Sequence, residues 1–158
     1  MAFSRWQFWR GVVAAWVVFM MLLALFLTFT AVVQSGPPWG SPYSTVVIYL
    51  MYGIPVGGIT AAVIAVVAAP AAWAVARGLS STRRIGLHLG AYLTLGAVLG
   101  LSVPVVSTLI GRGDLVHAFE VGYPWYAAAG CAVSITAGWS WTVWRSVREG
   151  SAPPLLQR

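Results

Sequence analysis

The chain has 158 residues, of which 59% are hydrophobic and only 8% are charged. A soluble domain carries about 25% charged residues, so this chain cannot cover a water-facing surface. The net charge of +6 does not indicate a nucleic-acid partner, because the basic residues flank apolar runs and do not line a groove. The sequence therefore predicts an all-α integral membrane protein, an antiparallel up-down-up-down bundle of four transmembrane helices.

Four apolar stretches predict the spans of a single membrane domain over residues 1–158, since a helix of about 20 apolar residues crosses a bilayer. The first stretch is too long for the apolar part of a signal peptide, which has about 7–15 residues, so we expect it to stay uncleaved. In chain order, the expected spans are residues 11–33, 44–70 (with a helix that could continue to 76), 85–110 and 122–143, followed by a tail over 144–158.

The basic residues, all of them arginines, divide unequally between the two sides of the predicted bundle. Only Arg112 falls on one side. The others fall on the opposite side: Arg5, Arg10, Arg77, Arg83, Arg84, Arg145, Arg148 and Arg158. Short cytoplasmic loops retain arginine and lysine, so this division predicts a plasma-membrane protein with both termini in the cytoplasm. The arginines suit a bilayer with an anionic inner leaflet.

Small residues recur at helical spacing in the expected spans, and such residues let membrane helices pack closely. They predict either packing within the bundle or a contact with a membrane-protein partner or a second copy of the chain. We expect the last three spans to form the tight core and residues 11–33 to pack at the periphery. The candidate interface residues are Gly86, Gly90, Gly96, Gly100, Gly130, Ser134 and Gly138.

Two prolines interrupt the expected spans and suggest kinks or a cavity. Proline removes a backbone donor and frees the carbonyl four residues earlier. Irregular backbone at membrane depth is tolerated where it is buried or lines a cavity. One hypothesis is therefore a cavity near Gly53, Pro55, Gly57, Gly100 and Pro104; the alternative is simple kinks satisfied by neighbouring hydroxyl groups.

Reactive side chains are few. Asp114, His117 and Glu120 form the only acid–histidine cluster, spaced so that neighbours could meet on a helix and hold a divalent cation; the alternative is a solvated loop. His88 is expected to lie near the inner interface beside Arg84 in a structural role, and Cys131 to pack as a small apolar residue. No catalytic residue and no cofactor is indicated.

These observations favour a non-enzymatic accessory or regulatory module that acts through helix contacts with another membrane protein. The alternative is a small transporter or channel subunit for a neutral or lipophilic solute, which rests on the two prolines and the glycines around them. An integral membrane enzyme is a third hypothesis, with the acid–histidine cluster as its only reactive groups.

Overall fold

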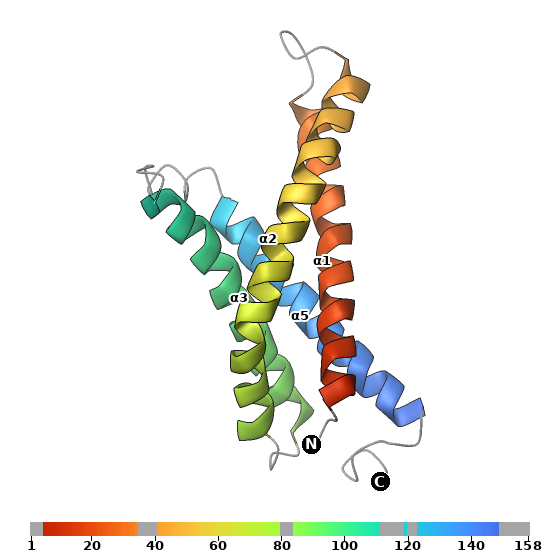
Figure 1. Cartoon of the computed structure of the whole chain (residues 1–158), viewed down its shortest axis with the longest axis vertical. Coiled ribbons are helices and arrows are strands. Elements are labelled where there is room, and N and C mark those ends of the chain that lie inside the picture. Colours follow the sequence, from red (N-terminus) through yellow and green to blue (C-terminus); the bar gives the residue numbers. More distant parts are fainter. Residues whose placement is uncertain (1–4, 35–40, 80–83, 111–118, 120–122, 149–158) are drawn as a thin grey trace.

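The computed structural model describes residues 5–34, 41–79, 84–110, 119 and 123–148, and nearly all of these residues are helical. The helices are α1 (Arg5–Val33), α2 (Pro42–Gly78), α3 (Ile85–Ile110) and α5 (Tyr123–Arg148), shown in Figure 1. The predicted all-helical class is confirmed.

The start of α2 shows how local sequence sets a helix boundary. Ser41 is the N-cap, and its side-chain oxygen accepts a hydrogen bond from the backbone N–H of Ser44 at 3.3 Å. Pro42 occupies the first turn, where its missing N–H would have had no helical partner and its fixed φ suits the helix. The helix then continues through Pro55 and Pro70 to Gly78, so neither internal proline ends it.

Three helical segments in the described residues are long and apolar enough to cross a membrane: Trp6–Val33, Pro42–Gly78 and Ile85–Val106. Helix α5 is not among them: serine and threonine residues recur along it, and Arg145 and Arg148 stand in its last turn. The membrane character expected from composition is therefore supported by three helices, while the expected fourth span has a more polar sequence.

The helices pair into two hairpins that cross each other. Helix α5 packs against both α3 and α1, and α1 also packs against α2, whereas α2 and α3 barely touch. The prediction that residues 11–33 lie at the periphery is therefore wrong, because α1 joins the two hairpins. That prediction was based on the bulky side chains in the middle of α1. The close contact with α5 at Gly138 involves only the small residues Gly11 and Ala15, near the start of α1.

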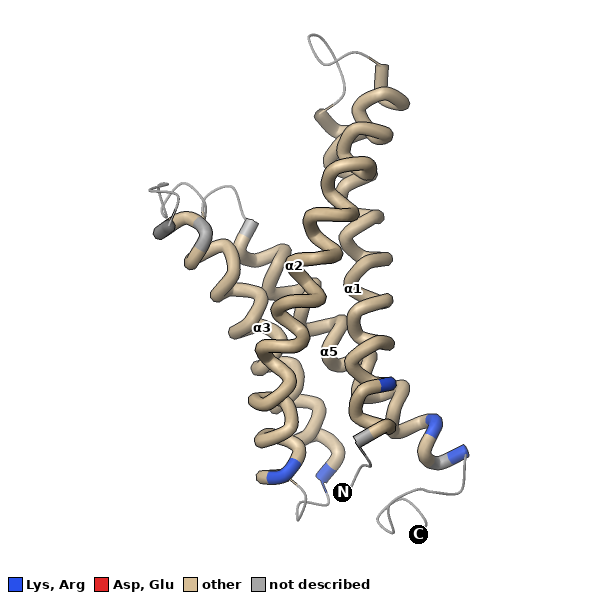
Figure 2. Tube along the Cα trace, viewed as in Figure 1, with Lys and Arg blue, Asp and Glu red and all other residues tan. Residues whose placement is uncertain are grey.

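The described arginines gather at one end of the assembly. They lie near the start of α1, at the end of α2, just before α3 and at the end of α5, and these four helix ends lie together (Figure 2). At the opposite end, α1 and α2 extend beyond α3 and α5 and lean away from them (Figure 1). No described residue is acidic, since Asp114, Glu120 and Glu149 lie outside the described ranges.

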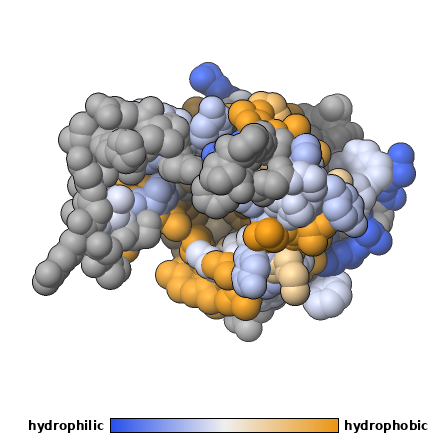
Figure 3. Space-filling model, turned by 90° about the horizontal axis from the view of Figure 1, so that it is seen from above, coloured by the Kyte–Doolittle hydropathy of each residue, from blue (hydrophilic) through white to orange (hydrophobic). Residues whose placement is uncertain are grey.

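The outer surface of the helices is strongly apolar. On α1, Met21, Leu25 and Phe29 share one face and are each about two-thirds exposed, at 65%, 67% and 68%. Seen from above, hydrophobic residues occupy the outside of the molecule on more than one side (Figure 3). Exposed apolar area of this extent is unfavourable in water and is typical of surfaces that contact a membrane or another protein.

Candidate functional site

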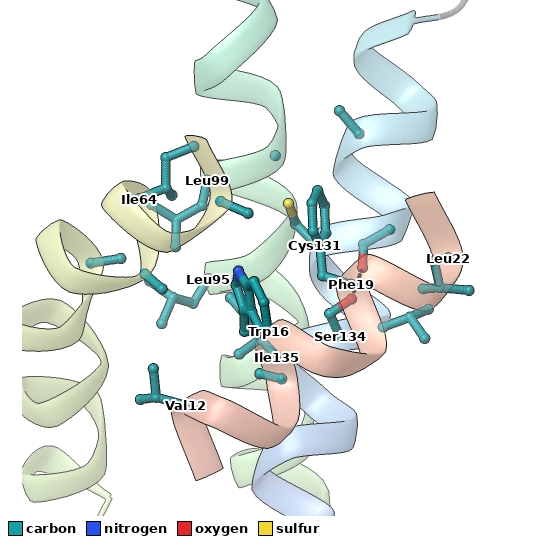
Figure 4. A pocket seen from close by; sticks show the side chains of 18 of the residues that line it. Val12, Trp16, Phe19, Leu22, Ile64, Leu95, Leu99, Cys131, Ser134 and Ile135 are labelled. Atoms are coloured by element: carbon teal, nitrogen blue, oxygen red, sulfur yellow. Dashed lines mark hydrogen bonds between the residues drawn. The ribbon is translucent and has the colours of Figure 1, made fainter. Parts of the chain in front are cut away.

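A long apolar space lies between the two hairpins, and we call it the central groove. Its walls are residues 8–26 of α1, 57–72 of α2, 92–104 of α3 and 126–142 of α5, and its volume is about 730 Å³. Figure 4 shows side chains from all four helices around it, among them Trp16, Ile64, Leu95 and Ile135. This volume falls in the range of about 300–1,000 Å³ that is typical of small-molecule sites.

The groove stays open because the closest helix contacts lie beside it. At the crossing of α1 and α5, a Cβ atom added to Gly138 would lie 2.5 Å from the carbonyl oxygen of Gly11. Between α3 and α5, a Cβ atom on Gly96 would lie 2.5 Å from the Cα atom of Ala132. These contacts fix α1 and α3 against α5, but no similar contact draws α2 onto α3.

Helix α2 faces the groove with small side chains. The small residues that line it on this helix are Gly57, Thr60, Ala61, Ala65, Ala68, Ala69 and Ala72. Alanine spacing of this kind allows close helix packing, yet α2 has few contacts with α3. The alanine face of α2 therefore borders open volume instead of another helix of this chain.

An aromatic contact between α1 and α2 lies beside one end of the groove. The rings of Phe8 on α1 and Trp73 on α2 meet edge to face, with their centroids 5.3 Å apart. The Arg77 guanidinium carbon lies 5.4 Å from the centroid of the Trp73 ring. Phe8 lines the groove, so one continuous set of contacts connects the groove with the basic end of the molecule.

The serine and threonine hydroxyl groups on the groove wall are hydrogen-bonded within their own helices. Ser134 donates to the Gly130 carbonyl at 2.6 Å, Thr60 to Val56 at 2.8 Å, and Thr142 to Gly138 at 2.9 Å. A hydroxyl group on a helix that donates to the carbonyl four residues earlier needs no hydrogen-bond partner outside that helix. These side chains therefore present mostly hydrocarbon to the groove.

Trp16 links the groove wall to the α1–α2 contact. Its indole N–H donates to the Gly58 carbonyl at 3.2 Å, and glycine lets the two helices approach at this position. The indole ring itself lines the groove. Because indole nitrogen is a donor only, this hydrogen bond fixes which edge of the ring faces α2.

An aromatic stack lies on the side of the groove formed by α3 and α5. His88 is only 2% exposed, and its ring lies parallel to Trp139, 5.9 Å between centroids and 9° between planes. Tyr92, one turn further along α3, stacks on the same indole ring at 5.8 Å. The sequence placed His88 near the inner interface, but burial between α3 and α5 depends on the position of Trp139. Cys131 is half-buried and lines the groove.

The candidate interface residues separate into two groups. Gly96, Gly100 and Gly138 are buried in helix contacts, where an added Cβ atom would meet a neighbour's backbone, and Ser134 is 3% exposed. An added Cβ atom would meet nothing within 4 Å at Gly86, Gly90 or Gly130.

The candidate cavity residues lie only in part around the groove. Gly57, Gly100 and Pro104 line it. Gly53 is instead covered by Leu27 of α1, and Pro55 is exposed and absent from the groove wall. The sequence did not indicate the other large contributions to the groove, from residues 8–26 of α1 and 126–142 of α5, because these depend on how the hairpins cross.

The acid–histidine cluster Asp114, His117 and Glu120 lies outside the described residues. Within the described ranges, no three histidine, cysteine or acidic side chains come together as a metal site would require. The site that the structure does contain is the central groove, a space of hydrocarbon and aromatic surface.

Fold and site together define an all-helical, membrane-type protein with an apolar groove between two helical hairpins. A comparison with known proteins finds no matching family model, no matching curated sequence and no matching solved structure.

Proposed function

We propose that the chain is a non-enzymatic membrane protein whose central groove binds a lipophilic guest. The observation that carries this proposal is the groove itself, about 730 Å³ of space bordered by all four helices. Its serine and threonine hydroxyl groups are bonded within their own helices, so a guest would be recognised mainly by shape and hydrocarbon contact. Binding, carriage or passage of a neutral lipophilic solute would all use this site.

We further propose that all four helices span the plasma membrane with both termini in the cytoplasm. Helix α5 packs against both α1 and α3, which are apolar enough to span, and the hydroxyl groups of Ser134, Thr142 and Ser146 are bonded to carbonyls of the same helix. The described arginines occupy one end, as the positive-inside rule requires of a cytoplasmic face.

A second candidate function is an accessory module that contacts another membrane protein or a second copy. It is favoured by the open face at Gly86 and Gly90 on α3, two small residues four apart, with no neighbour where a Cβ atom would lie. Replacing Gly90 by Leu would separate a partner or second copy while leaving the monomer folded. A variant that keeps every in-membrane crosslink of the natural protein would count against this candidate.

The guest-binding function can be tested with a lipid that carries a photoactivatable diazirine near the end of its acyl chain. In bilayers, we expect adducts on groove residues such as Leu95 and Ile135 at several times the yield on the outer face at Met21 and Leu25. The Ala65→Trp variant fills the groove from α2 and should abolish the groove adducts.

The matched control is Ala62→Trp, which adds the same side chain to an exposed position of α2 that is not on the groove wall. It should leave the groove adducts unchanged. Equal labelling of groove and outer face that neither tryptophan alters would remove the proposed function.

A further inference from the structure

We propose that the guest is one acyl chain of an anionic phospholipid from the leaflet on the basic side, with its head group held at Arg77. This inference rests on the proposed function, because it names the occupant of the same groove. It is carried by the length of the groove, the opening between α2 and α3, and the position of Arg77.

The groove is long enough for an acyl chain. On α2 its wall extends from Gly57 to Ala72, which corresponds to about 22 Å at 1.5 Å per residue. One leaflet contributes about half of a hydrocarbon core that is about 30 Å thick. An acyl chain that enters laterally between α2 and α3 can therefore lie within the groove over its whole length.

The gap between α2 and α3 gives a lipid a lateral path. These two helices have few contacts, and the α2 side of the groove consists mainly of alanine. A transmembrane helix of a partner would have to continue past both ends of the groove, one of which lies beside the Phe8–Trp73 contact. An acyl chain can end inside the groove and needs only the lateral path between α2 and α3.

The charge at the basic end selects the head group. Arg77 lies five residues beyond Ala72, a rise of about 7.5 Å, and it is exposed over the ring of Trp73. Arg84 stands on the other side of the gap, just before α3 begins. Zwitterionic and anionic phospholipids share the phosphate and differ in net charge, and basic sites between membrane helices recognise anionic lipid head groups.

The test compares two diazirine lipids with identical acyl chains, phosphatidylglycerol (anionic) and phosphatidylcholine (zwitterionic). In the natural protein, we expect phosphatidylglycerol to label the groove residues about fivefold more than phosphatidylcholine, the ratio that corresponds to about 1 kcal/mol for one near-surface cation. The Arg77→Gln variant should reduce that ratio to near one without changing labelling by phosphatidylcholine.

Arg148 provides a matched control, because its guanidinium carbon also lies over a tryptophan ring, that of Trp144, at 4.0 Å, but on α5 and not beside the gap between α2 and α3. The Arg148→Gln variant removes the same charge and should keep the fivefold preference. Equal labelling of the natural protein by the two lipids, or equal losses in the two variants, would overturn the head-group assignment while leaving groove binding intact. Absence of groove labelling by either lipid would overturn the proposed function as well.

Discussion

Gly138 of α5 lies against Gly11 of α1 so closely that a Cβ atom on Gly138 would sit 2.5 Å from the Gly11 carbonyl oxygen and 2.7 Å from the Ala15 Cβ atom. This contact joins the two hairpins, since α2 and α3 contribute little between them. Lipid tails are as apolar as leucine, so close packing of this kind takes the place that apolar burial has in water.

The contact at Gly138 predicts that Gly138→Ala destabilises the protein. Overpacking costs about 1–3 kcal/mol, and part of that loss is offset by the better helix propensity of alanine, by up to about 1 kcal/mol. We expect a lower apparent melting temperature in detergent by circular dichroism. Gly130→Ala is the control, because nothing lies within 4 Å of its added Cβ atom, and it should raise stability slightly. Equal effects at the two positions would contradict the crossing of α1 and α5.

The contact between α3 and α5 predicts a similar pair of outcomes on α3. Gly100→Ala would push a methyl group into the backbone of Ala127 and Ala128, which cannot rotate away, so we expect a loss of about 1–3 kcal/mol. Gly90→Ala has open space and should be neutral or stabilising. Crosslinking between cysteines introduced into α3 and α5 should fall in the first variant only. Retained crosslinking and stability in Gly100→Ala would contradict this packing.

Gly53 and Leu27 predict a compensating pair. The neighbour of an added Cβ atom at Gly53 is the Leu27 side-chain end, at 2.5 Å, and a flexible side chain can move where a backbone cannot. Gly53→Ala should therefore cost less than Gly100→Ala, and its cost should shrink further when Leu27→Ala is also present. Free energies of unfolding from a double-mutant cycle would measure the coupling, expected to be at least about 0.5 kcal/mol for residues in contact. Additive effects would show that the two residues are not in contact.

The hydrogen bond from the Trp16 indole to the Gly58 carbonyl predicts a modest loss on Trp16→Phe. Interhelical hydrogen bonds in membrane proteins contribute about 0.6 kcal/mol on average. The phenyl ring is also smaller than the indole ring it replaces, so the substitution leaves unfilled volume. Trp6→Phe, at a residue 70% exposed on the same helix, should change stability little. Denaturant titration in mixed micelles can compare the two variants. A larger loss at Trp6 than at Trp16 would count against this hydrogen bond.

Local sequence determined much of the helical framework. Ser41 and Pro42 set the start of α2, and residues 85–110 form α3 where an apolar stretch was expected. The separation of arginines from apolar runs also anticipated the basic end, because hydrophobic stretches and flanking charges are properties of contiguous sequence.

Only the tertiary structure decided which faces meet. Gly90 and Gly96 are both small residues of the same helix, yet one borders open space and the other lies against Ala132. The alanines of α2 have the spacing of a packing face but line the groove, whereas α1, which has a bulky middle, joins the two hairpins through Gly11 and Ala15. Small residues permit close approach without choosing a partner. That choice depends on the crossing of helices distant in sequence, and the crossing creates the groove.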